Sequence, residues 1–205
     1  MFCGPNCPVT DIRVYPGLIN QSIATHPYYT GGQYFIRPEW KQNRKSSWDL
    51  ALIRLNTALP LDGTSGKTGI NAICLPQKMA LNDNEEYALL NGFGNDNNNG
   101  TGFGIQRMGW TKIMKATYTD IYISVLDDYA LYAKRIPSLS GSAPCSGDSG
   151  SPYVQYVNGL AVVIGIQSGI FRVLGEDCPD VDSPLYAARV SYHIQWIIKT
   201  INDNN

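Results

Sequence analysis

The sequence lacks both an excess of one charge and a long apolar run. Sixteen Lys and Arg nearly balance 17 Asp and Glu, and charged residues make up only 16% of the chain, below the roughly 25% usual in soluble domains. The absence of a basic stripe argues against nucleic acid or an anionic membrane surface as the main partner. The longest clean apolar run, Leu160 to Ile164, is too short to span a bilayer. We therefore expect no nucleic-acid partner and no membrane span.

A signal peptide is also missing from the first 20 residues, which have no basic start followed by an apolar block. The five cysteines do not make an even set; they are Cys3, Cys7, Cys74, Cys145 and Cys178. Their spacing matches no zinc site, so we expect no metal and no cofactor. The expected arrangement is two bridges and one orphan thiol in an oxidising compartment, with the partners of Cys3, Cys7 and Cys74 left open. Sequons at Asn20 and Asn99 are compatible with secretion.

Tyrosine, glycine and proline are plentiful, with 13, 20 and 12 copies, which favours short strands joined by turns. Alternating or continuous apolar patterns predict six strands. These are Asp11–Tyr15, Leu50–Leu55, Tyr87–Asn91, Trp110–Met114, Thr119–Leu126 and Leu160–Gln167. We expect Leu50–Leu55 to be buried on most of both faces. The stretch Gly92–Gly104, rich in Gly, Asn and Asp, is expected to be a mobile surface loop.

The last segment has a different period. Val190, Ile194, Ile197 and Ile201 are spaced 4, 3 and 4 residues apart, which predicts one stripe of an amphipathic helix. Trp196 and Ile198 widen that stripe. The sequence therefore predicts a mostly β chain with one C-terminal helix.

The stretch Cys145–Pro152 contains the motif most indicative of chemistry. Within it, glycines on both sides of Ser149 permit a tight turn that exposes the serine hydroxyl and lets nearby N–H groups converge. A serine nucleophile needs such donors to stabilise an oxyanion, and it also needs a base to remove its proton. The N–H groups of Gly147 and Ser149 are the candidate donors. Taken alone, Gly-Asp-Ser-Gly favours an ordinary polar turn, because so short a motif often occurs without function.

Four further segments resemble landmarks of the chymotrypsin-like serine protease family, and they occur in that family's order. They are Trp48–Leu55, Ile73–Pro76, Asn91–Gly94 and Val190–Ile197. The first resembles the family's Asp-Ile-Ala-Leu-Ile-x-Leu signature and places Asp49 100 residues before Ser149, close to the separation in the family. The chain is identified as a relative of these proteases.

This resemblance implies an all-β fold of two antiparallel β-barrels, the first one incomplete, with a C-terminal α-helix. Residues 1–76 would be a remnant of the N-terminal barrel, and residues 77–205 would form the C-terminal barrel and the helix. It implies that Ser149 is the nucleophile, that Asp49 orients the general base, and that Gly147 and Ser149 form the oxyanion hole. It also implies secretion and a peptide or protein substrate or inhibitor as partner.

The same resemblance implies the substrate-binding residues. Ser168 would begin the binding strand, and Ala143 would form the floor of the primary specificity pocket, where alanine disfavours a Lys or Arg side chain. Gly169, Ile170 and Leu185 depart from the family's usual residues at the pocket, so we expect a small apolar side chain to bind.

Two structural features of the turn also follow from the resemblance. Cys145 is expected to bridge to Cys178. Asp148 matches the aspartate that pairs with an activated amino terminus; with no such segment in this chain, we expect it to be solvated or in a zymogen-like arrangement.

The family's catalytic histidine has no clear counterpart here. The chain has only His26 and His193. His26 resembles a non-catalytic surface segment, and His193 begins the last helix. The expected place of the base is at Phe2, next to Cys3, or upstream of Met1. Two functions stay open: a serine endopeptidase domain that is inactive as this chain, or a protease homologue that binds or regulates without catalysis.

Overall fold

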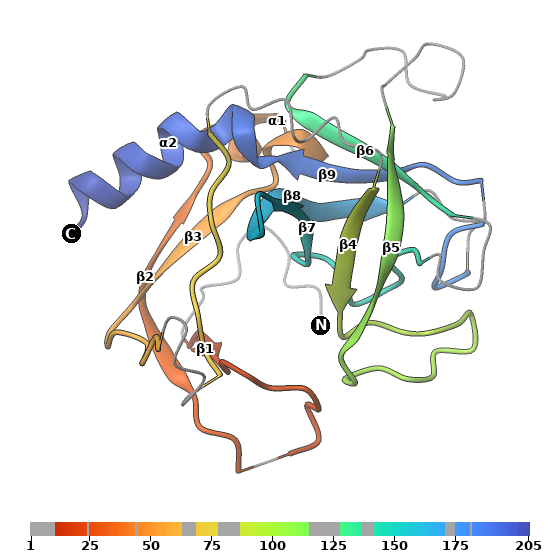
Figure 1. The fold of residues 1–205 in the computed structure, drawn as a ribbon, viewed down its shortest axis with the longest axis horizontal. Coiled ribbons are helices and arrows are strands. Elements are labelled where there is room, and N and C mark those ends of the chain that lie inside the picture. The colour runs from red at the N-terminus through yellow and green to blue at the C-terminus, as the bar shows by residue number, and fades with distance from the viewer. Residues whose placement is uncertain are drawn as a thin grey trace.

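The computed structural model divides the chain between an open sheet, a closed barrel and a terminal helix (Figure 1). It describes residues 11–23, 25–43, 45–62, 69–77, 87–114, 128–136, 142–170, 175–180 and 182–205. The mostly β prediction with one C-terminal helix is confirmed. The predicted strand Thr119–Leu126, together with Cys3 and Cys7, lies outside the described residues.

The open sheet contains three antiparallel strands in the order β1-β2-β3. They are β1 (Arg13–Val14), β2 (Tyr29–Ile36) and β3 (Ala51–Leu55). Two short helical elements, α1 (Pro38–Asn43) and the 3-10 turn η1 (Ser46–Trp48), lie between β2 and β3. This sheet is the described part of the expected first barrel.

The expectation that Leu50–Leu55 is buried on both faces is wrong. Leu50 is buried, but Ala51 and Arg54 are exposed, and Ile53 is 47% exposed. Within the described residues, β3 pairs only with β2. Leu50 and the partly buried Leu52 pack against a cluster that includes Val163 and Val190, and the rest of the strand faces solvent. A continuous apolar run thus overstates burial where a sheet stays open.

The closed barrel has six antiparallel strands in the order β4-β5-β6-β9-β8-β7. They are β4 (Tyr87–Gly92), β5 (Arg107–Met114), β6 (Ala130–Arg135), β7 (Pro152–Val157), β8 (Leu160–Ile170) and β9 (Leu185–Arg189). Asn158 and Gly159 join β7 to β8 with φ values of +50° and +79°. Two residues with positive φ suit the twist of a tight hairpin. Closure leaves the barrel with no free sheet edge.

Inward-facing side chains fill the barrel. The most deeply buried of its core residues are Ala88, Tyr153, Ile164, Leu185 and Ala187. The partly buried side chains of Ala143 and Ile170 pack against this core. Ile170 also lines a cavity at Ser149, so this residue connects the barrel core with that cavity.

The terminal helix α2 (Val190–Asp203) connects the two sheets. Val190 and Ile197 pack with Leu50 of the first sheet's side and with Val163 of β8. The predicted stripe is buried at its start, but Ile201 is 43% exposed and Ile198, expected to widen the stripe, is 49% exposed. No helix among the described residues is long and apolar enough to cross a membrane.

Candidate functional site

The turn before β7 presents Ser149 at the surface. Ser149 is exposed, and the residues on either side are held by main-chain hydrogen bonds from Asp148 N to Cys145 O and from Gly150 N to Gln167 O, at 3.1 and 2.8 Å. Gly147 has a φ of +99°, which a residue with a side chain rarely adopts. The motif therefore forms the tight, exposed turn that its glycines favour.

Asp49 follows η1 and lies half-buried at the start of β3. Ser168 Oγ donates a hydrogen bond of 2.8 Å to Asp49 Oδ2, although 119 residues separate the two. Ser168 and Ser149 line the same cavity of about 200 Å³. The structure thus brings the carboxylate, the expected binding-strand serine and the exposed serine into one region.

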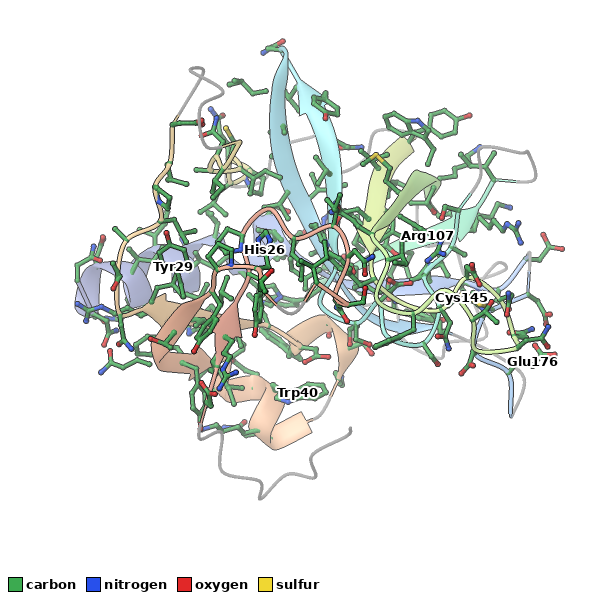
Figure 2. All side chains as sticks on the ribbon, turned by 90° about the horizontal axis from the view of Figure 1, so that it is seen from below. His26, Tyr29, Trp40, Arg107, Cys145 and Glu176 are labelled. Atoms are coloured by element: carbon green, nitrogen blue, oxygen red, sulfur yellow. A yellow bond between two sulfur atoms is a disulfide. The ribbon has the colours of Figure 1, made fainter. Side chains whose placement is uncertain are left out.

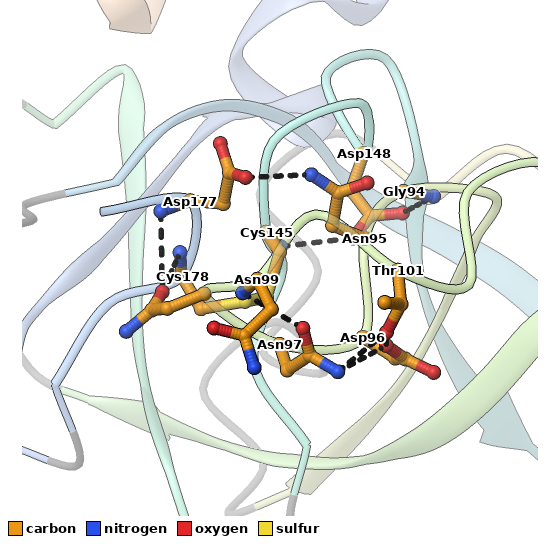
Figure 3. The surroundings of a disulfide bond; sticks show 11 residues. Gly94, Asn95, Asp96, Asn97, Asn99, Thr101, Cys145, Asp148, Asp177 and Cys178 are labelled. Atoms are coloured by element: carbon orange, nitrogen blue, oxygen red, sulfur yellow. Dashed lines mark hydrogen bonds between the residues drawn. A yellow bond between two sulfur atoms is a disulfide. The ribbon is translucent and has the colours of Figure 1, made fainter. Parts of the chain in front are cut away.

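The disulfide expected from the resemblance is present between Cys145 and Cys178, whose Cα atoms are 4.2 Å apart (Figure 3). Next to it, Ser146 N donates to Asp177 O at 2.7 Å. These two links tie the serine turn to the segment that leads toward β9. Of the described cysteines, Cys74 is free and exposed.

Asp148 accepts hydrogen bonds at both carboxylate oxygens. Gly94 N donates to Oδ1 at 2.8 Å and Cys145 N donates to Oδ2 at 2.9 Å. The side chain is half-buried. One donor, Gly94 N, comes from the loop after β4, and the other, Cys145 N, comes from the serine turn itself. The expectation that Asp148 is solvated or in a zymogen-like arrangement stays a prediction.

The cavity at Ser149 is lined, among the described residues, by Cys145, Ser146, Gly147, Ser149, Gln167, Ser168 and Ile170. Ala143 lines a larger cavity of about 450 Å³ beside Asp148 and Cys178. Gly169 lies in β8 opposite Tyr186 and does not line the smaller cavity. The role of Ala143 as the floor of the primary specificity pocket stays a prediction.

Leu185 lies in the barrel core and is not among the described residues that line either cavity. It stands opposite Ile170 in the β8–β9 pairing, and only 1% of its surface is exposed. A glycine at this position would leave space in the core.

Tyr153 and Gln167 form a buried polar pair that the sequence did not suggest. Tyr153 is fully buried, and its hydroxyl donates to Gln167 Oε1. Gln167 Nε2 in turn donates to Gly169 O at 2.8 Å. Burial raises the pKa of Tyr153 well above its ordinary value, and the charge of Asp148 adds to the effect. Gln167 directly precedes Ser168 in the sequence, and this neighbouring position is the one feature that could have pointed to Gln167.

Both histidines hydrogen-bond main-chain oxygens away from this cavity. His26 Nε2 lies 2.7 Å from Pro16 O, in the connection between β1 and β2, well separated from Cys145 (Figure 2). His193 is completely buried, its Nε2 lies 2.8 Å from Ser47 O, and its ring contacts Trp48. No histidine occurs among the described residues that line the Ser149 cavity. Nor do the described residues contain a cluster of three or more His, Cys, Asp or Glu suited to a metal ion.

Comparison with known proteins adds three kinds of relative. The family model described as Trypsin matches residues 3–197. Chymotrypsin-like elastase family member 1 of Macaca fascicularis is 25% identical over 194 residues, covering 91% of this chain and 67% of that protein. Inactive CLIP domain-containing serine protease A3 of Aedes aegypti is 25% identical and covers 93% of this chain. Transmembrane protease serine 5 of Homo sapiens is 25% identical and covers 94%. The chain spans 40% and 38% of the length of these last two proteins.

Proposed function

Because this chain belongs to the trypsin family of serine proteases, we propose that it forms the nucleophile-bearing and substrate-binding part of a serine endopeptidase domain. The substrate would be a peptide or protein. We propose further that residues 1–205 by themselves do not hydrolyse peptide bonds, because they supply no imidazole at Ser149.

The hydrogen bond between Ser168 and Asp49 carries this proposal. It joins the first sheet to β8 at the cavity that also exposes Ser149. A half-buried carboxylate held at this point is suited to orient an imidazole and to stabilise it once protonated. An ordinary turn aspartate would have no reason to be anchored to the strand beside an exposed serine.

In the proposed reaction, Ser149 Oγ attacks the substrate carbonyl carbon and the general base takes its proton. The N–H groups of Gly147 and Ser149 stabilise the oxyanion that forms. With the base absent, the serine hydroxyl stays protonated and is a poor nucleophile. Removing one member of such a triad costs on the order of 10⁴-fold or more in kcat.

A fluorophosphonate probe tests the proposal directly. Residues 1–205 should label no faster than the Ser149→Ala variant, and rapid labelling that Ser149→Ala abolishes would contradict the missing base. A gain-of-function arm uses Phe2→His, since Cys3 as the family's cysteine after the histidine would put residue 2 at the base. Labelling of Phe2→His that disappears in Phe2→His/Ser149→Ala would support both the base position and the nucleophile.

A second candidate function is a non-catalytic protease homologue that binds a protein partner or an inhibitor. The departures from the family's usual residues at Gly169, Ile170 and Leu185 favour it. One relative is itself named an inactive serine protease. The transcript upstream of Met1 discriminates between the two. An Ala-His-Cys segment there supports the endopeptidase, and a complete domain with another residue in place of that histidine supports the homologue.

We also propose that the protein is secreted. The Cys145–Cys178 bridge supports an oxidising compartment, because disulfides of this kind persist outside the cytosol. Expression with a cleavable secretion signal should give a protein in which Cys145 and Cys178 are alkylated only after a reductant is added.

A further inference from the structure

The two Asn-x-Ser/Thr sequons of the chain, at Asn20 and Asn99, have no part in the proposed reaction. A sequon that accepts an N-linked glycan lies on a surface loop of a secreted protein. Because the glycan is bulky and strongly hydrated, the asparagine that carries it must face solvent. The structure places these two asparagines in different surroundings.

Asn99 lies at the tip of the loop that joins β4 to β5. The main chain of this tip forms a turn, in which Gly100 N donates to Asn97 O at 3.3 Å and Asn99 N donates to Asn97 Oδ1 at 2.8 Å (Figure 3). Gly100 has a φ of +72°, a value that suits glycine in a tight turn. Asn98, Asn99 and Gly100 are all exposed. The turn therefore presents Asn99 to solvent.

The side chain of Asn99 makes no hydrogen bond to a described residue, whereas its neighbours hold the loop in place. Asn98 Oδ1 accepts from Cys178 N at 2.7 Å, and Thr101 Oγ1 donates to Asp96 Oδ1 at 2.7 Å (Figure 3). Asn99 is also not among the described residues that line either cavity. A glycan on Asn99 would thus break no described contact, and the Ser149 cavity would stay open.

Asn20 is half-buried, at a seam between two segments. It pairs with Ile105 in an isolated antiparallel bridge, and the next residue, Gln21, donates its N–H to Gly104 O at 2.7 Å. The side-chain oxygen of Asn20 accepts from Ser22 N and Ser22 Oγ at 2.9 and 2.7 Å. A glycan at Asn20 would have to leave a packed seam, whereas one at Asn99 would leave an exposed tip.

We propose that Asn99 carries an N-linked glycan in the secreted protein and that Asn20 does not. This inference rests on the proposed secretion, because the oligosaccharide is transferred in the secretory pathway. In the transfer, Asn99 Nδ2 attacks the anomeric carbon of a polyprenyl-diphosphate-linked oligosaccharide. A bond forms between Nδ2 and that carbon, the bond from the carbon to the diphosphate oxygen breaks, and Nδ2 loses a proton. The polyprenyl diphosphate is the leaving group.

Expression of the full chain behind a cleavable secretion signal in mammalian cells tests the assignment. Intact-mass spectrometry before and after peptide N-glycosidase treatment should show the loss of one glycan from the wild type. Asn99→Gln and Thr101→Ala should already lack that mass, whereas Thr101→Ser keeps the sequon and should keep the glycan. Asn20→Gln is the matched control and should also keep it. A glycan that persists in Asn99→Gln, or that disappears in Asn20→Gln, would overturn the assignment.

Peptide mapping locates the glycan independently of the variants. When the glycan is released in ¹⁸O-labelled water, the glycosidase converts the glycosylated asparagine to an aspartate that contains ¹⁸O. The label should appear at residue 99, and its appearance at residue 20 would overturn the proposal.

Alkylation of Cys145 and Cys178 reports on the proposed secretion separately. A secreted chain that has this disulfide but no glycan would overturn the present inference and leave the proposed secretion standing. An unglycosylated chain whose two thiols are alkylated without a reductant would overturn both.

Discussion

Replacing Leu185 by alanine is the most direct test of how the barrel closes beneath the candidate site. Leu185 lies in β9, pairs across the sheet with Ala133 on one side and Ile170 on the other, and is 1% exposed. Leu185→Ala removes three carbon atoms from the core of the barrel. A closed barrel cannot move one strand inward without disturbing its neighbours, so much of the space should persist as a cavity.

The expected cost follows from this burial. Leu→Ala in protein cores costs about 2–5 kcal/mol, and more where the site cannot collapse. We expect a loss of about 3–5 kcal/mol in the free energy of unfolding for Leu185→Ala. In a chain of this size, each kcal/mol lowers Tm by about 2–4 °C, so Tm should fall by roughly 10 °C.

Urea and thermal denaturation followed by circular dichroism measure the effect. Leu160→Ala is the matched control, since Leu160 occupies the start of the adjacent strand β8 and is 60% exposed. It should change stability by less than about 0.5 kcal/mol. The reasoning fails if Leu185→Ala costs less than about 1 kcal/mol, a value typical of a position that repacks freely.

Three further outcomes are expected from the structure. Tyr153→Phe removes a buried hydrogen bond and should cost about 1–3 kcal/mol near neutral pH by urea denaturation. Burial raises the pKa of Tyr153 in the folded chain, so the stabilisation from its neutral hydroxyl should be complete below about pH 10 and decrease as the pH rises above that value. Tyr153→Phe should make this decrease in unfolding free energy shallower. Equal slopes of unfolding free energy against pH in the two proteins would contradict this. Replacing Cys145 and Cys178 together by alanine removes a disulfide that links residues 33 positions apart and should lower the free energy of unfolding by about 3–4 kcal/mol in the chain-entropy model. An unchanged unfolding free energy by calorimetry would contradict this. His193→Ala should cost about 2–4 kcal/mol because a fully buried ring and its hydrogen bond are lost, and half-buried His26→Ala should cost under about 1.5 kcal/mol; the reverse order would show that their burial is misassigned.

Most strands that the alternation predicted are present near their expected bounds, but four others were not anticipated. The missed strands are β2, β6, β7 and β9. The strands β6 and β9 pack residues inside the barrel and also contact η1 on the outside, so both of their faces carry apolar residues and the alternation is weak. In β2 and β7 a register shift, between Gly31 and Gln33 and between Tyr153 and Val154, interrupts the alternation.

For the candidate site, local spacing predicted which residue types lie in the turn but not what surrounds them. The glycines of Cys145–Pro152 indicated a tight turn, and Gly147 does adopt a positive φ. Spacing did not show that Ser149 and Ala143 line different cavities, because each cavity is formed by several segments that are distant in sequence. The roles of Ser149, Asp49 and Gly147 in catalysis stay predictions.

The order of short motifs along the chain is enough to determine the family, the mostly β architecture and the terminal helix, because each depends on residues close together in sequence. Tertiary structure alone decides that Ser168 reaches Asp49 and that His193 binds the main-chain oxygen of Ser47. These two contacts join residues that are 119 and 146 positions apart in the sequence. Their geometry arises only when the two sheets and the terminal helix pack together.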